Sequence, residues 1–94
     1  MVSAITLLEI AVVFGKGATP GKIAADKILG VLDSHPAIHI APLSIEVAAE
    51  VAALGDSLRD PADRAIVATA RVSRVKLITS DRRIIDSELV PVVA

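Results

Sequence analysis

Apolar residues follow a helical spacing in four segments of the chain and form short continuous runs between them. Ser, Thr-Pro and Asp-Pro start signals, combined with this spacing, predict helices over 3–14, 19–33, 44–54 and 60–73, and a helical turn over 81–87. The short apolar runs predict strands over 37–43, 75–79 and 89–93. Helices that alternate with short strands predict an α/β fold with parallel pairing, and we expect one domain over residues 1–94.

Three carboxylates stand alone in apolar segments of this pattern. Glu9 lies in SAITLLE, Asp63 in DPADRAIVATA and Asp81 at the end of VKLITSD. Because burial makes an unpaired charge costly, each of these acids needs a compensating partner, and a shared cation is one explanation.

Glu9 also has an ordinary interpretation. Ser3, Thr6 and Glu9 recur at a spacing of three residues, so on a helix they form one polar stripe. The stripe is either functional or simply the solvated face of an amphipathic helix, and this segment alone does not choose between the two.

Asp60, Asp63 and Asp81 have capping interpretations as well. Asp60 at N-cap, followed by Pro61 and by Asp63 at N3, is an ordinary helix start. Asp63 can equally project into a crevice at the strand ends. Asp81 directly follows a predicted strand, where ligands of parallel sheets usually bind, but a turn aspartate that caps the next helical turn fits too.

Composition limits the function classes. The chain has 94 residues, 53% hydrophobic, with Phe14 as its only aromatic residue, so the composition favours helix-on-sheet packing over aromatic platforms for base stacking. Ten basic and eleven acidic residues give a net charge of −1, so any nucleic-acid contact has to be local. The absence of cysteine is compatible with a cytoplasmic location. The longest apolar stretch, interrupted by Glu9, is too short to span a membrane.

In combination, these segments resemble the PIN domain, most closely the VapC toxins of toxin–antitoxin pairs. The family's S-x-x-T-x-x-E helix corresponds to Ser3, Thr6 and Glu9, and its later helix with an aspartate before a small-residue run corresponds to Asp63 with AIVATA. Its strand that ends in T-x-D corresponds to Thr79, Ser80 and Asp81. The segments occur in family order over nearly the whole chain.

The resemblance implies a metal-dependent endoribonuclease that hydrolyses RNA phosphodiester bonds with Mg²⁺ or Mn²⁺. It implies that the catalytic and metal-binding acids are Glu9, Asp63 and Asp81. The accessory positions that it implies are Ser3, Thr6, Asp60, Thr79 and Ser80. We expect Arg64 and Arg82 to be the first candidates for contacts with RNA phosphates, although most basic residues here also fit solvated helix and turn charges.

The resemblance also implies a three-layer PIN-like fold that is truncated at its N-terminus. Family members begin with a central strand that carries another aspartate, whereas here Met1 lies two residues before Ser3. A shortened chain, a start codon set downstream and a remnant gene would each explain this. We therefore expect a homo-oligomer or a partner such as a VapB-like antitoxin. The alternative function is a catalytically defective module that binds an antitoxin or another PIN chain.

Overall fold

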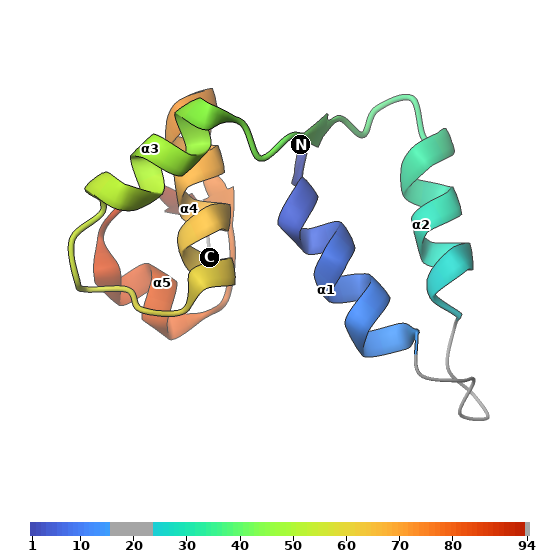
Figure 1. Ribbon diagram of the computed structural model, residues 1–94, viewed down its shortest axis with the longest axis horizontal. Coiled ribbons are helices and arrows are strands. Elements are labelled where there is room, and N and C mark those ends of the chain that lie inside the picture. Colours follow the sequence, from blue (N-terminus) through green and yellow to red (C-terminus); the bar gives the residue numbers. More distant parts are fainter. Residues whose placement is uncertain (16–23, 94) are drawn as a thin grey trace. The chain divides into compact units, whose positions relative to one another are not determined.

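The computed structural model describes residues 1–15 and 24–93 of the chain (Figure 1). The chain divides into two compact units, Met1–Pro42 and Leu43–Ala94. Each unit has its own helices and its own pair of parallel strands, and each is described by itself below.

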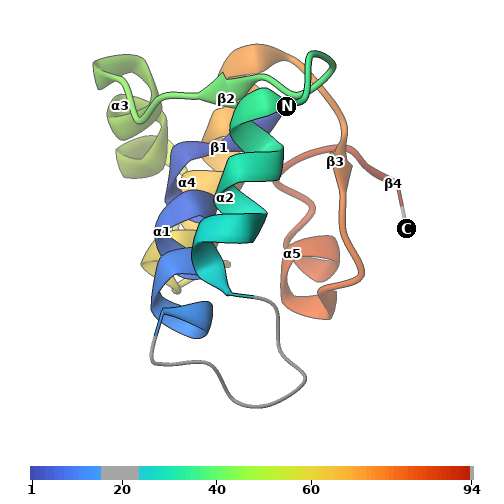
Figure 2. The same cartoon turned by 90° about the vertical axis from the view of Figure 1, so that its right-hand side faces the viewer.

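The first unit is a strand–helix–helix–strand arrangement. Its elements are β1 (Val2–Ser3), α1 (Ala4–Phe14), α2 (Ala25–Ser34) and β2 (Ile40–Ala41). β1 and β2 pair in parallel, with Val2 opposite Ile40, and the Val2 N–H donates to the His39 carbonyl at 2.8 Å. In the sequence, α1 and α2 lie between the two strands. In space, the two helices lie side by side (Figures 1 and 2).

Local signals decide where these helices begin. Ser3 is extended and its hydroxyl accepts a hydrogen bond from the Ile5 N–H at 3.3 Å, so the predicted N-cap of α1 is confirmed. Among the described residues the second helix, α2, begins at Ala25, after the extended Ala24, so the predicted helix over 19–33 is not continuous through Ala24. Thr19 and Pro20 themselves lie outside the described residues.

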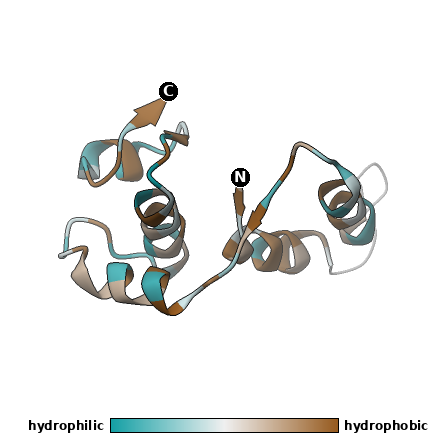
Figure 3. Cartoon of the chain, turned by 90° about the horizontal axis from the view of Figure 1, so that it is seen from above, coloured by the Kyte–Doolittle hydropathy of each residue, from teal (hydrophilic) through white to brown (hydrophobic). Residues whose placement is uncertain are grey.

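Helix α1 is apolar over most of its surface (Figure 3). None of the residues of α1 and α2 is buried, and Leu8, Val12 and Val13 are exposed. Thr6 and Glu9 are the polar residues of α1, and the exposed apolar residues leave a surface on which a protein partner could pack.

The second unit contains three helices and two strands. Its elements are α3 (Ile45–Ala53), α4 (Pro61–Ser73), β3 (Leu77–Ile78), α5 (Arg82–Ser87) and β4 (Val92–Val93). β3 and β4 pair in parallel, and α3 packs against α4. Arg71 on α4 also joins Glu50 on α3 in an ion pair of 2.6 Å.

The apolar core lies in this second unit. Val67 on α4 is fully buried, and the other buried apolar side chains surround it from α3, the loop after α3, α4, α5 and the segment before β4. They are Val47, Leu54, Leu58, Ala68, Ala70, Ile84 and Val90. This core holds the beginnings of α4 and α5 next to each other, and those two helix starts carry three of the predicted acidic residues, Asp60, Asp63 and Asp81.

The α/β class and the parallel pairing predicted from the sequence are confirmed. The strands are much shorter than predicted, at two residues each, and β1 was not predicted at all. Pro42 follows β2 and Pro91 precedes β4, and a proline has no N–H to extend a ladder. Among the described residues, no helix is long and apolar enough to cross a membrane.

Candidate active site

The starts of α4 and α5 both carry aspartate caps. The Asp60 carboxylate accepts a hydrogen bond from the Asp63 N–H at 3.0 Å, and the Asp81 carboxylate accepts one from the Arg83 N–H at 2.9 Å. These bonds satisfy N–H groups that have no partner within a helix. The capping interpretation of Asp60 and Asp81 is therefore confirmed, and any chemical role of these residues is additional to it.

Helix capping does not explain the burial of the Asp63 side chain. This side chain is only 14% exposed, and its Oδ2 atom is buried without a hydrogen-bond partner among the residues that the structure describes. Burial raises the pKa of Asp63, the Asp60 charge raises it further, and Arg83 opposes both effects. A buried carboxylate oxygen that lacks a donor has a coordination position open for a cation.

Arg83 connects Asp63 with Asp81. Its Nη2 atom lies 3.1 Å from Asp81 Oδ2 and 3.6 Å from Asp63 Oδ2. The hydrogen bonds that Arg83 donates to Asp81 lower the pKa of Asp81 and raise that of Arg83. The two acids therefore lie within reach of one positive charge, although they come from different helices.

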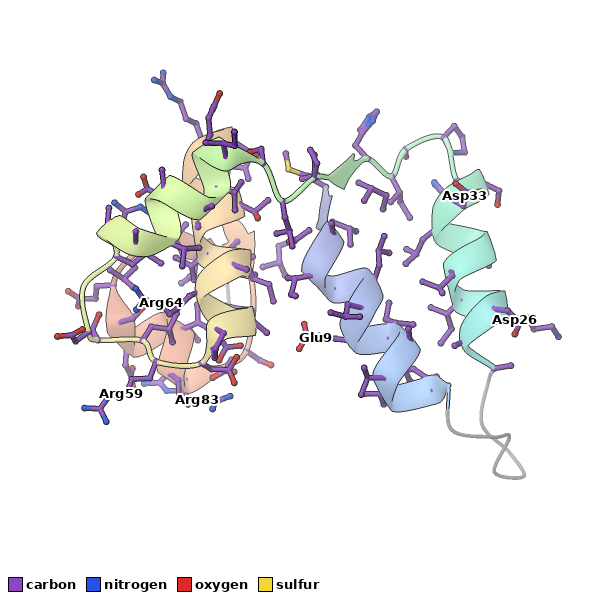
Figure 4. The ribbon with its side chains drawn as sticks, in the orientation of Figure 1. Glu9, Asp26, Asp33, Arg59, Arg64 and Arg83 are labelled. Carbon is purple, nitrogen blue, oxygen red and sulfur yellow. The ribbon has the colours of Figure 1, made fainter. Side chains whose placement is uncertain are left out.

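A pocket of about 240 Å³ opens beside these acids. Its walls come from the loop between α3 and α4, the start of α4 and one residue of α5: Asp56, Ser57, Leu58, Arg59, Asp60, Asp63 and Arg83. Arg59 extends away from the ribbon at this loop (Figure 4). The pocket thus combines carboxylates with two guanidinium groups, which suits an anionic substrate held next to a cation.

Thr79 and Ser80 precede Asp81 in the chain. The Thr79 hydroxyl accepts a hydrogen bond from the Asp81 N–H at 3.1 Å, which fixes the backbone between β3 and α5. Ser80 is exposed. The accessory roles of both residues stay predictions, and Thr79 has a direct bond through which it orients Asp81.

The two arginines predicted to contact RNA are held by other groups. Arg64 donates hydrogen bonds to the carbonyls of Val51, Gly55 and Leu58 at 2.6 to 2.7 Å. Arg82 is 76% exposed and pairs with Asp86, four residues later, at 3.1 Å. Contacts of these two residues with RNA stay predictions, while the structure gives Arg64 a role in fixing the pocket loop.

Sequence reasoning did not select Arg59 and Arg83 as first candidates, yet both line the pocket. For Arg83 a signal exists, because an arginine two residues after an N-cap aspartate can reach back to that carboxylate. For Arg59 the sequence offers no comparable signal, since its position depends on the path of the loop.

Ser3, Thr6 and Glu9 belong to the first unit. Ser3 caps α1, Thr6 lies on the first turn of α1, and Glu9 projects from that helix as an exposed side chain (Figure 4). The grouping of Glu9 with Asp63 and Asp81 stays a prediction from the sequence.

A site for a divalent metal ion needs several oxygen ligands close together. Within residues 1–15 and 24–93, no group of three or more potential ligands is close enough to hold a metal ion. The Asp63 and Asp81 pair nevertheless fits part of such a site. A buried oxygen of Asp63 lacks a hydrogen-bond donor, and the positively charged Arg83 side chain already bridges the two carboxylates. Carboxylate oxygens are also the ligands that Mg²⁺ and Mn²⁺ prefer.

The second unit thus has the features of an α/β protein with an acidic site beyond the carboxyl end of a parallel strand. The PIN domain family matches residues 1–87 of the chain, so this chain belongs to the PIN family. PIN domains are generally nucleases that depend on divalent metal ions. Searches of curated proteins and of solved structures found no match.

Proposed function

We propose that this protein is a metal-dependent endoribonuclease of the VapC toxin type, which hydrolyses RNA phosphodiester bonds. The observation that carries the proposal is the buried Oδ2 of Asp63, which has no hydrogen-bond donor among the described residues and shares the Arg83 guanidinium with Asp81. Membership of the PIN family supports the nuclease class. The RNA substrate and the toxin type rest on the S-x-x-T-x-x-E, Asp63 and T-x-D segments of the sequence.

In this proposal Asp63 and Asp81 would hold Mg²⁺ or Mn²⁺, and the resemblance of the sequence adds Glu9 as a third candidate carboxylate. A metal ion held by these acids would lower the pKa of a bound water and neutralise charge on the scissile phosphate. Thr79 orients Asp81 through its backbone N–H, and Asp60 fixes the first turn of α4, which carries Asp63. Ser3, Thr6 and Ser80 are further accessory candidates.

The pocket arginines give this site a way to bind the substrate. Arg59 is exposed on the pocket loop, and a guanidinium matches the oxygens of a phosphate. Arg64 holds that loop by its three hydrogen bonds to carbonyls. We therefore place Arg59 before Arg64 and Arg82 as a contact for the RNA backbone.

A second function is an interaction module that binds a VapB-like antitoxin or another PIN chain. The exposed apolar residues of α1, including Leu8, Val12 and Val13, support this function because such a surface favours a protein partner. Light scattering coupled to size-exclusion chromatography tests self-association. A mass above that of one chain supports it, and a monomer across a wide concentration range counts against it.

Cleavage of defined RNAs with Mn²⁺ tests the nuclease proposal. We expect Asp63→Asn and Asp81→Asn to reduce cleavage by about 100-fold or more, because each removes a charged ligand. Asp86→Asn is the matched control, since Asp86 lies on α5 but pairs with Arg82. Cleavage that survives both substitutions, or that persists in a chelator, would overturn the proposal. Metal binding that depends on Asp63 but without cleavage would favour the interaction module.

A further inference from the structure

One guanidinium joins the two acids of the proposed metal site. Arg83 contacts Asp63 at N3 of α4 and Asp81 at the N-cap of α5, in both cases through Nη2. A positive charge therefore already occupies the space between the carboxylates that a metal ion would need.

The two ends of this bridge are unequal. Asp81 accepts hydrogen bonds from Arg83 Nη2 at 3.1 Å, from Nε at 3.4 Å and from the backbone N–H at 2.9 Å. Asp63 Oδ2 has only the charge contact at 3.6 Å. A guanidinium has a fixed planar fork, whereas a divalent cation accepts oxygens from several directions at roughly 2.1 Å. A metal ion is therefore better suited than Arg83 to satisfy both acids at once.

Burial does not hold Arg83 in place. Its side chain is 70% exposed, although it contacts an Asp63 carboxylate that is mostly buried. A long exposed side chain changes rotamer without disturbing the core. Arg83 can therefore leave the two carboxylates while α4 and α5 keep their positions.

We propose that Arg83 is an internal counter-cation that holds the Asp63 and Asp81 carboxylates together without metal and has to release them before a divalent cation binds. The inference rests on the proposed function, because these acids are those of the proposed metal site. Two cations at the same oxygens repel each other, so Arg83 and the metal exclude one another. Arg83 is in this sense a positioning residue that sets the metal affinity of the site.

Binding of Mn²⁺ to the whole chain, measured by calorimetry and by the electron paramagnetic resonance of free Mn²⁺, tests this competition. We expect Arg83→Gln to bind Mn²⁺ about tenfold or more tightly, because the competing charge is gone. Arg83→Lys keeps a positive charge and should stay near the wild-type affinity. Arg82→Gln is the matched control, since Arg82 is the neighbouring arginine and pairs with Asp86.

Thermal unfolding gives a readout that is independent of activity. Without metal, Arg83→Gln should melt below the wild type, because Asp63 and Asp81 lose their shared partner. Mn²⁺ should then raise its melting temperature more than that of the wild type, as tighter binding to the folded state requires.

The outcomes separate failure of this inference from failure of the proposed function. If the wild type and Arg83→Gln bind Mn²⁺ equally, and Asp63→Asn abolishes binding in both, the metal site stands and the competition is wrong. If neither chain binds Mn²⁺, or if Asp63→Asn leaves binding unchanged, the metal site and the competition are both wrong. Tighter binding in Arg83→Gln that depends on Asp63 supports both.

Discussion

The two units of this protein use apolar residues in different ways. In the second unit, α4 is amphipathic and buries Val67 completely. In the first unit, α1 is the more apolar helix, yet none of its residues is buried. The comparison shows that a hydrophobic helix is not by itself a core, because burial also requires surfaces that pack against it.

The same difference separates the candidate site residues. Asp60, Asp63 and Asp81 are held at helix starts on a packed core, and their hydrogen bonds and ion pairs are defined. Glu9 is an exposed residue of a helix that has no buried residue. The acids of the second unit are therefore positioned by the core and by the bonds of the unit that carries them, whereas no core side chain and no ion pair among the described residues positions Glu9.

The largest expected effect on the second unit comes from Arg64. We expect Arg64→Met to lower the free energy of unfolding by about 3 kcal/mol, because three carbonyls lose a charged donor. Urea unfolding followed by circular dichroism measures this change. Arg82→Met is the control, and it should stay within about 0.5 kcal/mol because Arg82 is exposed. Equal effects of the two substitutions would contradict the role of Arg64 in holding the loop.

A valine-to-alanine substitution, made once in each unit, tests the comparison directly. Val67→Ala should cost roughly 2 kcal/mol of stability, because Val67 is fully buried and its loss leaves a cavity. Val12→Ala on α1 should cost less than about 0.5 kcal/mol, since Val12 is 58% exposed. Urea unfolding of the two variants provides the measurement. A large effect of Val12→Ala would show that α1 is covered in solution.

A smaller effect is expected at the N-cap of α4. Asp60→Ala should cost about 1 kcal/mol, because the Asp63 N–H loses its acceptor. Asp60→Asn keeps a capping oxygen and should retain most of this stability, which the thermal unfolding of both variants would show. If the two variants melt at the same reduced temperature, charge rather than capping is the contribution of Asp60.

The smallest expected effects come from Asp63 and Asp81, and they have opposite signs. The pKa of Asp63 is raised above 3.8 by burial, so its contribution to stability is present below pH 3.8 and is lost as pH rises through the raised value. The pKa of Asp81 is lowered by Arg83, so its contribution is present above pH 3.8 and is lost as pH falls through the lowered value.

Without metal at pH 7, we therefore expect Asp63→Asn to raise the melting temperature and Asp81→Asn to lower it. Differential scanning calorimetry between pH 3 and pH 7 measures both changes, and the differences from the wild type should shrink toward the acid end. Two shifts of the same sign at pH 7 would contradict the contrast between the buried and the hydrogen-bonded carboxylate.

The sequence was sufficient to predict the features that depend on neighbouring residues. The N-caps Ser3, Ser44 and Asp60 are confirmed, because each satisfies an N–H two or three residues later. The end of α4 at Ser73 is confirmed as well. The strands were predicted too long. A hydrophobic run shows where a strand can form, but it does not show how many of its residues pair with a neighbouring strand.

Features that join distant segments escaped prediction. Arg64 fits equally well as a phosphate ligand or as a donor to carbonyls, and only the path of the loop after α3 decides between these. Arg83 reaches Asp63, twenty residues earlier, because the core places α5 beside the start of α4. The burial of Asp63 Oδ2 has the same origin and could not be predicted from the sequence.

The central claim is that Asp63 and Asp81 bind the metal ion of a nuclease. Its most direct test adds substoichiometric Mn²⁺ to the ¹⁵N-labelled chain and records which amide resonances broaden. We predict that broadening begins at residues next to Asp63 and Asp81 and is lost in Asp63→Asn. Broadening that is absent, or that is confined to other parts of the chain, would contradict the claim.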